Sequence, residues 1–243
     1  MRPPVALTVA GTDSGGGAGI AADLKTFAAH GVWGTCAVTA VTAQNTIRVD
    51  DVQLLGLEIV AAQIRAVATD MPLAATKTGM LGHPAVVRAV AMAVEEFHLH
   101  PLVVDPVATA SSGERLLSSA GLNELRDRLL PLSDLVTPNL AEAAALARWP
   151  DPPVGREEMQ RVGEAILGLG PKAVLVTGGH LLGAEAADLL VQADGSEPRW
   201  FSGPRLDTPN THGTGCVLSA AIAAGVGLGA GPGAVNPSGS SPP

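Results

Sequence analysis

The sequence contains no tyrosine, and aromatic residues make up only 2% of it. A flat ligand therefore cannot depend on an aromatic cage. Cysteine is also scarce, because Cys36 and Cys216 are far apart in the chain and belong to no CxxC pair. This spacing excludes a disulfide framework and a cysteine-based zinc site, and it is typical of a protein from a reducing compartment.

Positive charge is in short supply. The chain has 15 Lys and Arg against 23 Asp and Glu, a formal net charge of −8, whereas a nucleic-acid-binding surface needs a basic stripe. No apolar run reaches the roughly 20 residues that span a bilayer, and the first residues carry no secretory cleavage pattern. We therefore expect a soluble, cytoplasmic protein that binds neither nucleic acid nor membrane.

Hydrophobic residues make up 47% of the 243 positions, in short apolar runs that alternate with stretches of helical period. Strands are predicted at residues 5–10, within 32–43 (VTAVTA), and at 74–78, 101–105, 134–137, 173–177, 187–192 and 199–202. Helices are predicted at 19–30, 58–69, 84–97, 118–130, from 138, 157–169 and 213–228. This alternation predicts an α/β fold with helices on both faces of a central, mostly parallel sheet. The hairpin signal Asp194-Gly195 interrupts the alternation and argues against a closed barrel.

We expect one domain over residues 1–228. From 229 to 243 the composition turns to Gly, Pro, Ser and Asn, which cannot bury a core, so this segment is predicted to be a disordered tail. In open parallel sheets, ligands bind beyond the carboxyl ends of the strands. The segments that follow predicted strands are therefore the candidates for a functional site.

The first such segment, residues 11–19, has the sequence GTDSGGGAG. Its glycines let the backbone approach a ligand near a helix N-terminus. Residues 17–22 fit a loose dinucleotide-binding pattern, but no acidic residue ends the second strand, and no Lys follows as it would in a P-loop. By themselves the glycines favour a flexible strand–helix turn, and Asp23, one turn into the helix, is expected to be solvated.

Two further segments also follow predicted strands. Gln44 and Asn45 offer donors and acceptors that can pair with the edge of a heterocyclic base, although an asparagine-centred turn explains them more simply. Asp105 ends a buried strand, where its carboxylate is placed to act on a metal or its water shell. An Asp-Pro pair is equally a common turn opener.

Residues 137–142, TPNLAE, open a predicted helix. We predict Thr137 as its N-cap and Pro138 as its first residue. Asn139 and Glu142 then share one helix face, where an amide and a carboxylate can orient phosphates bound to Mg²⁺. The alternative is a Glu that is favoured there by the helix dipole alone.

The segment NTHGTGC, residues 210–216, opens the last predicted helix and is the strongest candidate. Gly213, Thr214 and Gly215 leave successive backbone N–H groups bare at the positive end of a helix dipole. Such groups form an anion site that can hold a phosphoryl group during transfer. Cys216 at this terminus is expected to have its thiolate favoured, and the flanking glycines favour function over a buried structural cysteine.

Together these segments resemble the hydroxymethylpyrimidine/phosphomethylpyrimidine kinases of thiamine biosynthesis, in the ribokinase-like superfamily. The motifs that carry the resemblance are AGTDSGGGAGI, ADLKTF, VTAQNT, KTGML, VVDPV, SG at 112–113, TPNLAEAAAL, GGH at 178–180 and NTHGTGC followed by LSAA. Each motif alone is weak, but their order and spacing are highly specific.

The resemblance implies a three-layer αβα fold and an enzyme that uses ATP and Mg²⁺ to phosphorylate 4-amino-5-hydroxymethyl-2-methylpyrimidine and then its monophosphate. It implies that Gln44 hydrogen-bonds the aminopyrimidine, in a pocket lined by Gly11, Asp23, Met80 and Val107. The nucleotide and metal positions that it implies are Asn139, Glu142, Asp105, Thr177 and Gly179. Residues 213–216 match the anion hole, with Cys216 where related sugar kinases carry an aspartate base.

The chain departs from the family pattern at Thr177, Ala108, Ala110 and Pro209, where members commonly carry Lys, Met or Arg. It also ends in the predicted tail where members continue with one or two helices. These departures keep open the alternative of a catalytically weak pyrimidine-binding protein. A pyridoxal kinase-like activity is a second alternative, although the QNT segment and the cysteine of GTGC both favour the pyrimidine enzyme. A homodimer is also compatible with the resemblance, whereas an NAD-dependent oxidoreductase would leave HGTGC without a role.

Overall fold

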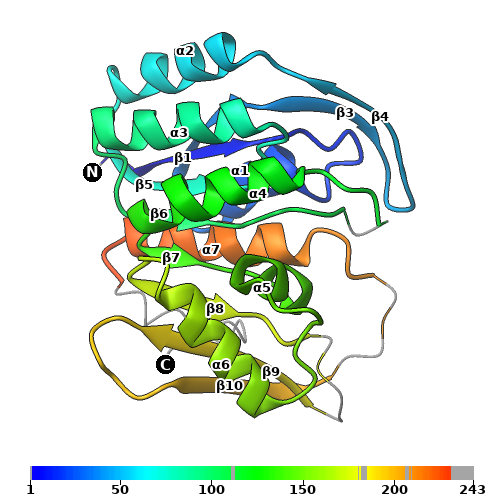
Figure 1. Ribbon diagram of the computed structural model, residues 1–243. Coiled ribbons are helices and arrows are strands. Elements are labelled where there is room, and N and C mark those ends of the chain that lie inside the picture. The colour runs from blue at the N-terminus through cyan, green and yellow to red at the C-terminus, as the bar shows by residue number, and fades with distance from the viewer. Residues whose placement is uncertain are drawn as a thin grey trace.

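The computed structural model describes residues 2–110, 113–179, 181, 185–205, 208 and 210–230. Its main sheet has eight strands in the order β10-β9-β8-β7-β6-β5-β1-β2 (Figure 1). Their bounds are β1 Val5–Ala10, β2 Trp33–Val38, β5 Leu73–Thr78, β6 Leu102–Val104, β7 Leu135–Val136, β8 Ala173–Val176, β9 Glu185–Gln192 and β10 Arg199–Pro204. The six strands from β2 to β8 pair in parallel, and β9 and β10 add an antiparallel edge.

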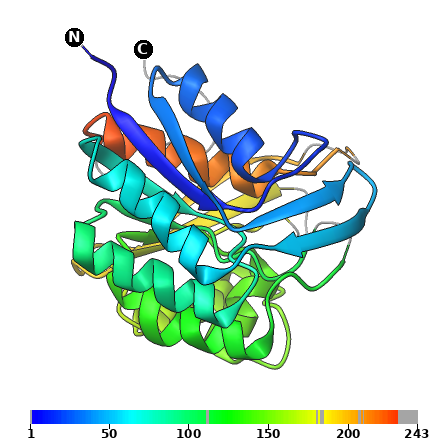
Figure 2. The ribbon, with the colours of Figure 1, turned by 90° about the horizontal axis from the view of Figure 1, so that it is seen from above.

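Helices cover both faces of this sheet, as the alternation of the sequence predicts. Helices α1 (Gly19–Ala29) and α7 (Thr214–Gly227) pack on one face, and α2 (Leu57–Ala68), α3 (Pro84–Phe97), α4 (Ser119–Glu124), α5 (Leu140–Ala147) and α6 (Arg156–Leu167) cover the other (Figure 2). A separate apolar core lies on each side. The central strands are buried on both faces, which is why β6 is apolar throughout, as is usual in parallel sheets.

Residues 32–43, which are predicted to contain one strand with the sequence VTAVTA, hold two strands that belong to two sheets. β2 ends at Val38, and β3 (Ala40–Gln44) pairs with β4 (Val49–Leu54), which the sequence analysis missed, in an antiparallel two-stranded sheet. Thr39 is the reason for the break. It is fully buried, its N–H donates to Ala10 O, its hydroxyl donates to Met80 O at 2.6 Å, and its carbonyl accepts from Leu55 N.

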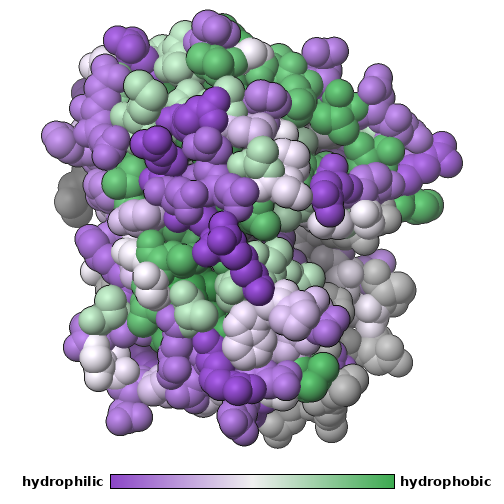
Figure 3. All heavy atoms as spheres, viewed as in Figure 1, coloured by the Kyte–Doolittle hydropathy of each residue, from purple (hydrophilic) through white to green (hydrophobic). Residues whose placement is uncertain are grey.

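This small sheet, β3–β4, projects from the body of the molecule, beyond the carboxyl ends of the parallel strands (Figure 1). Apolar side chains are exposed on it, among them Val41 and Ile47, and Figure 3 shows hydrophobic residues mixed with polar ones along it. Its position next to the sheet edge makes it a wall of the candidate site.

Two smaller expectations also change. The predicted helix over residues 118–130 is α4 followed by a π-helical turn at Leu125–Leu129 and a 3₁₀ turn at Leu130–Leu132. Most of the predicted tail, residues 231–243, lies outside the described residues, so the domain boundary stays a prediction. Across the part of the chain that is described, no helix combines the length and apolar character needed to span a membrane.

Candidate active site

Five loops meet at the carboxyl edge of the parallel strands, the edge where α/β sheets bind ligands. They follow β1, β5, β6, β7 and β8. Helix α7 runs back along β5, so that Gly227 lies against Ala74 and Ala75 at the start of that strand while Gly213 meets the loop after β1. The N-terminus of α7 therefore lies among these five loops.

The glycine-rich loop, residues 13–19, is held in place by Asp13. The Asp13 carboxylate accepts from the backbone N–H groups of Gly15, Gly17 and Ala18 at 2.8–3.0 Å, and from His212 Nε2 at 2.9 Å. Burial raises the pKa of Asp13, but His212 and the three N–H groups together lower it below its ordinary value. The sequence suggested a flexible turn, and the structure instead shows a loop organised around one buried carboxylate.

Gln44 lies at the end of β3 and is joined to the same loop. Its backbone N–H donates to Ser14 Oγ at 2.8 Å, and the Ser14 hydroxyl donates to Gln44 O at 2.6 Å. The Gln44 side chain is half-buried, with Oε1 3.4 Å from the Thr42 hydroxyl. Asn45 forms the predicted asparagine turn, since its Oδ1 accepts from the N–H groups of Ile47 and Arg48.

Three further residues of the predicted acceptor pocket follow neighbouring strands. Gly11 directly follows β1, and Met80 follows β5. A Cβ added to Gly11 would lie 3.2 Å from Met80 Sδ. Val107 follows β6 and is half-buried, with its N–H bonded to Asp105 O. The structure thus places these three residues at the same edge as Gln44.

Asp23 is not solvated, and this expectation was wrong. Its side chain is fully buried, accepts from the Thr8 hydroxyl at 2.6 Å, and pairs with Lys77 Nζ at 2.8 and 2.9 Å. Lys77 is fully buried too, in the middle of the sheet. Because a lone buried charge is very costly, the two groups need one another.

Asp105 extends this charge cluster toward the sheet edge. Its Oδ2 lies 3.9 Å from Lys77 Nζ and accepts from the hydroxyl of Ser219, a fully buried residue of α7, at 3.0 Å. Burial raises the pKa of Asp105, and Lys77 and Ser219 offset only part of that effect. Asp105 is therefore a buried carboxylate that is joined to α7, and not just the first residue of a turn.

Cys216 lies near the same cluster, in the first turn of α7. Burial raises the pKa of its thiol to about 11, and the charges of Asp105 and Asp23 act in the same direction against Lys77 and the Gly19 N–H. The expectation of a favoured thiolate was therefore wrong. The helix N-terminus is outweighed chiefly by burial of the thiol, and the charges of Asp105 and Asp23 add to that effect.

The start of α7 fits closely against the glycine-rich loop. Gly213 has a φ of +79°, and a Cβ there would overlap the carbonyl oxygen of Gly17, so both its conformation and its space require glycine. Thr214 and Gly215 are exposed at the helix end whose first N–H groups have no partner within the helix. The predicted anion hole thus opens to solvent at the sheet edge.

Asn139 and Glu142 form a capping box at the start of α5. Asn139 Oδ1 accepts from Glu142 N at 2.9 Å, and Glu142 Oε2 accepts from Asn139 N at 3.0 Å. The N-cap is therefore Asn139 and the first helical residue is Leu140. The predictions of Thr137 and Pro138 for these two positions were wrong, because Asn139 can bond the first turn and Thr137 directly follows β7. Burial and the nearby charge of Asp105 raise the pKa of Glu142 to about 8.

Thr177 and Gly179 follow β8, the next strand. The Thr177 N–H donates to Pro138 O at 2.9 Å, which places it beside the start of α5. The loop is held from two other segments, because Asp188 of β9 accepts from Gly178 N at 2.9 Å and the Arg205 guanidinium donates to Gly179 O. His180, Ser112 and Pro209, which the sequence analysis also named, lie outside the described residues.

Sequence reasoning missed Lys77, Ser219 and the pairing of Asp13 with His212. Lys77 left a signal, since a lysine inside an otherwise uncharged strand of a parallel sheet needs a buried carboxylate partner. Ser219 and His212 left none. Their partners are 114 and 199 residues away in the chain, and only the topology brings them together.

The structure thus has a mostly parallel sheet between two helical layers, with a helix N-terminus and two carboxylates at its carboxyl edge, as the resemblance to ribokinase-like kinases implies. The phosphomethylpyrimidine kinase family profile matches residues 13–235. The chain therefore belongs to the phosphomethylpyrimidine kinase family, and the predicted resemblance is confirmed.

Individual proteins agree with this assignment. The chain is 49% identical over 221 residues to the hydroxymethylpyrimidine/phosphomethylpyrimidine kinase of Salmonella typhimurium, covering 90% of this chain and 81% of that one. It is similar to the crystal structure of phosphomethylpyrimidine kinase from Clostridium difficile, with a TM-score of 0.81, 40% identity, and coverage of 94% and 92%. Pyridoxal kinase from Staphylococcus aureus in complex with AMP-PCP and pyridoxal has a TM-score of 0.87 at 29% identity, covering 96% and 83%.

Proposed function

We propose that the chain transfers the γ-phosphoryl group of ATP to 4-amino-5-hydroxymethyl-2-methylpyrimidine and then to its monophosphate. One observation carries this proposal: Gln44 and the start of α7, with Cys216, are held by the same short loop, Gln44 through Ser14 and α7 through Asp13. A residue that can select the pyrimidine and a site that can hold a migrating phosphoryl group therefore lie on the two sides of one loop. The names of the relatives support the same acceptor.

Recognition of the acceptor rests on hydrogen bonds. The Gln44 amide can both donate to and accept from the edge of an aminopyrimidine, and Gly11, Met80 and Val107 supply an apolar or backbone lining. No stacking residue is needed, which agrees with the low aromatic content of the chain. We propose that the fully buried Asp23 supports this pocket from beneath through Lys77.

The N-terminus of α7 supplies the stabilisation of charge. Phosphoryl transfer passes through a loose transition state in which charge is spread over the phosphoryl oxygens, so positioning and electrostatics matter more than a strong base. The Thr214 N–H, which the sequence predicted to be bare, instead donates to Thr211 O at 3.3 Å. We propose that the N–H groups of Gly213, Gly215 and Cys216 donate to the phosphoryl oxygens without reorganising. Their fit against the glycine-rich loop fixes where the phosphoryl group passes.

Cys216 acts in this scheme as a neutral thiol. With a pKa of about 11, it keeps its proton at neutral pH and is not a ground-state base. In a loose transition state the acceptor hydroxyl needs to lose its proton only late. We infer that the thiol orients the acceptor oxygen toward the anion hole, and that the acceptor proton passes to solvent water after the new P–O bond has largely formed.

Asp105 and Glu142 have the donor set for Mg²⁺. This ion is typically held in proteins by one or two carboxylates together with waters and substrate phosphates, and no cluster of three or more His, Cys, Asp or Glu is placed to hold a metal within the described ranges. Burial and the Asp105 charge disfavour the ionised form of Glu142, and a cation bound between the two carboxyl groups would favour that form. When bound, Mg²⁺ would neutralise charge on the phosphates of ATP.

The nucleotide is expected to lie over the ends of β7 and β8. Asn139 positions Glu142 through the capping box, and Thr177 and Gly179 border the same place from the next strand. The Staphylococcus aureus pyridoxal kinase was solved with AMP-PCP, which supports ATP as the donor. A homodimer and a cytoplasmic location stay predictions.

A coupled assay of ADP release, with hydroxymethylpyrimidine, its monophosphate and pyridoxal as competing acceptors, tests the proposal. We expect turnover with both pyrimidines in the presence of Mg²⁺ and a much lower kcat/KM with pyridoxal. Faster turnover of pyridoxal would establish the alternative acceptor. Heat of pyrimidine binding without ADP formation would reduce the protein to a pyrimidine-binding module.

A further inference from the structure

The glycine-rich loop and the start of α7 are joined by a pair of side chains that the proposed reaction does not use directly. Asp13 and His212 are 199 residues apart, and their atoms Oδ2 and Nε2 lie 2.9 Å apart. Both side chains are largely withdrawn from solvent, at 1% and 15% exposure. The same Asp13 oxygen also accepts from the N–H groups of Gly17 and Ala18, so one carboxylate oxygen is shared between the two segments.

Packing around this pair leaves little room for it to move. A Cβ on Gly17 would lie 2.9 Å from Cδ2 of the His212 ring, and a Cβ on Gly213 would overlap the Gly17 carbonyl oxygen. The backbone of the loop therefore touches the start of α7 on both sides of the hydrogen bond. Lys25 adds a bond on the outer side of the loop, where its Nζ donates to Gly16 O at 2.7 Å.

The neighbours of the pair are the residues that the reaction requires. His212 directly precedes Gly213, the first residue of the anion hole. Asp13 directly precedes Ser14, which holds the backbone of Gln44 by two hydrogen bonds. At the far end of the loop, the Gly19 N–H acts to lower the pKa of the Cys216 thiol, against the larger effect of burial.

We propose that Asp13 and His212 form a positioning clasp, which sets the distance and orientation between the acceptor pocket and the anion hole. The inference rests on the proposed function and adds two positioning residues to it. Neither side chain needs to touch a substrate. Because phosphoryl transfer depends steeply on alignment, loss of the clasp lowers turnover more than it lowers acceptor binding.

Three variants test the clasp. His212→Phe keeps a ring of similar size but removes the donor, and His212→Gln supplies an amide N–H that can reach Asp13. His100→Phe is the matched control, since His100 Nδ1 also lies 2.9 Å from a carboxylate, that of Asp134, at the opposite edge of the sheet. We expect His212→Phe to lower kcat by about tenfold or more with the pyrimidine KM changed less than about threefold.

His212→Gln should recover kcat to within about threefold of the wild type, and His100→Phe should leave kcat unchanged. A wild-type kcat in His212→Phe, an equal loss in His100→Phe, or a His212→Gln as slow as His212→Phe would each overturn the clasp. If His212→Phe does not fold, His212→Asn, whose amide is too short to reach Asp13, takes its place in the comparison with His212→Gln.

Amide hydrogen exchange separates failure of the clasp from failure of the proposed function. In His212→Phe we expect faster exchange at residues 14–19 and 213–216, with unchanged exchange in α3 on the other face of the sheet. This measurement needs no turnover, so it tests the clasp even if the wild type phosphorylates neither pyrimidine. Unchanged exchange at both segments would refute the clasp whatever the kinetics show.

Discussion

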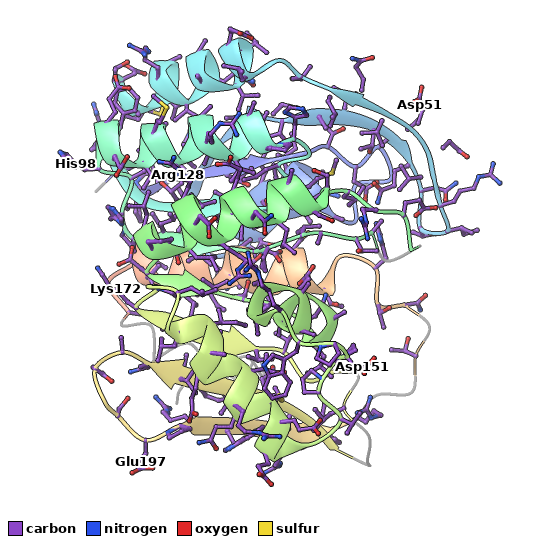
Figure 4. The ribbon with its side chains drawn as sticks, viewed as in Figure 1. Asp51, His98, Arg128, Asp151, Lys172 and Glu197 are labelled. Atoms are coloured by element: carbon purple, nitrogen blue, oxygen red, sulfur yellow. The ribbon has the colours of Figure 1, made fainter. Side chains whose placement is uncertain are left out.

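The two edges of the sheet each carry an aspartate that accepts hydrogen bonds from a histidine and from the backbone. One aspartate lies at the candidate active site, and the other joins the starts of three strands. At the carboxyl edge, Asp13 binds His212 and three N–H groups. At the amino edge, Asp134 binds His100, Lys172 and the Leu102 N–H at 2.7–2.9 Å. Figure 4 shows Lys172 on the side of the molecule opposite Asp51 of β4, which lies beyond the carboxyl edge.

The surroundings explain the difference between the edges. Asp134 ties together the starts of β6, β7 and β8, next to an open cavity of about 270 Å³ lined mainly by apolar residues such as Val103 and Val226. His100, Lys172 and the Leu102 N–H all donate to Asp134. Burial raises the pKa of Asp134, but these three donors together lower it below its ordinary value. This edge is organised for stability.

The carboxyl edge keeps groups that folding alone would not favour. Glu142 and Asp105 repel one another, the thiol of Cys216 has a raised pKa, and the buried hydroxyls of Thr78 and Thr137 find no hydrogen-bond partner among the described residues. Such unfavourable features are tolerated at functional sites and are compensated elsewhere in the fold. The same motif, an aspartate with a histidine, therefore serves alignment at one edge and stability at the other.

Removal of the thiol should have the largest effect. We expect Cys216→Ala to lower kcat by about 100-fold, the size expected for a misaligned acceptor, while the affinity for the pyrimidine stays nearly intact, because the thiol acts on the acceptor oxygen and not on the ring. Steady-state kinetics and calorimetry measure the two quantities. Cys36→Ala, in β2, is the matched control and should be neutral; a normal kcat in Cys216→Ala would remove the thiol from the mechanism.

The protonation of that thiol provides the second prediction. A pKa of about 11 in place of 9.0 leaves the thiolate roughly 100-fold rarer at pH 8, since each pKa unit is a factor of ten. We expect alkylation of Cys216 by iodoacetamide, followed by peptide mass spectrometry, to be slower by at least this factor than that of a free cysteine, and to accelerate up to about pH 11. Rapid labelling at pH 8 would contradict the buried, protonated thiol.

Gln44→Ala should act on binding rather than on turnover. Loss of the partner of a polar ring edge costs roughly 1–3 kcal/mol, which is about 5- to 150-fold in KM for the pyrimidine. The expected kcat is close to that of the wild type. Asn45→Ala tests the specificity of the effect, because Asn45 serves its own turn; an unchanged KM in Gln44→Ala would refute the assignment of the ring contact.

At the amino edge we expect a loss of stability without a loss of activity. Asp134→Asn removes charge-assisted bonds and should lower the free energy of unfolding by about 1–3 kcal/mol at pH 7. Because the pKa of Asp134 is lowered on folding, its stabilisation is present above the ordinary carboxyl pKa and is lost as the pH falls through the lowered value. The free energies of unfolding of the wild type and of Asp134→Asn, measured with denaturant, should therefore converge as the pH falls toward about 2. A kcat of Asp134→Asn reduced by more than about threefold would contradict the contrast between the edges.

Lys172→Met should have the smallest effect. The Lys172 side chain is 75% exposed, so its ion pair with Asp134 is screened by solvent and contributes at most about 1 kcal/mol. Thermal unfolding in low and high salt measures it, and the difference from the wild type should shrink in high salt. A loss as large as that of Asp134→Asn would show that Lys172, and not the backbone bond, dominates this edge.

Local pattern was sufficient for most of the architecture. The bounds of β1 and α3 agree with their predicted ranges, and the hairpin at Asp194-Gly195 is the antiparallel pair β9–β10, because burial periodicity and turn chemistry are local properties. The order and spacing of the motifs were sufficient to predict the family. The pattern gave the wrong result at Thr39, where one buried residue bonds through its backbone to Ala10 and Leu55 and through its hydroxyl to Met80, and so separates β2 from β3.

The sequence by itself determined the fold class, the candidate segments and the chemistry of the residues on them. Only the tertiary structure decided how those residues act on one another. It paired Asp23 with Lys77 and Asp13 with His212, across 54 and 199 residues, and it placed Cys216 near buried carboxylates that raise the pKa of its thiol. The physical reason is that a pKa and an ion pair depend on burial and on spatial neighbours, which the order of strands in the sheet sets and no local pattern records.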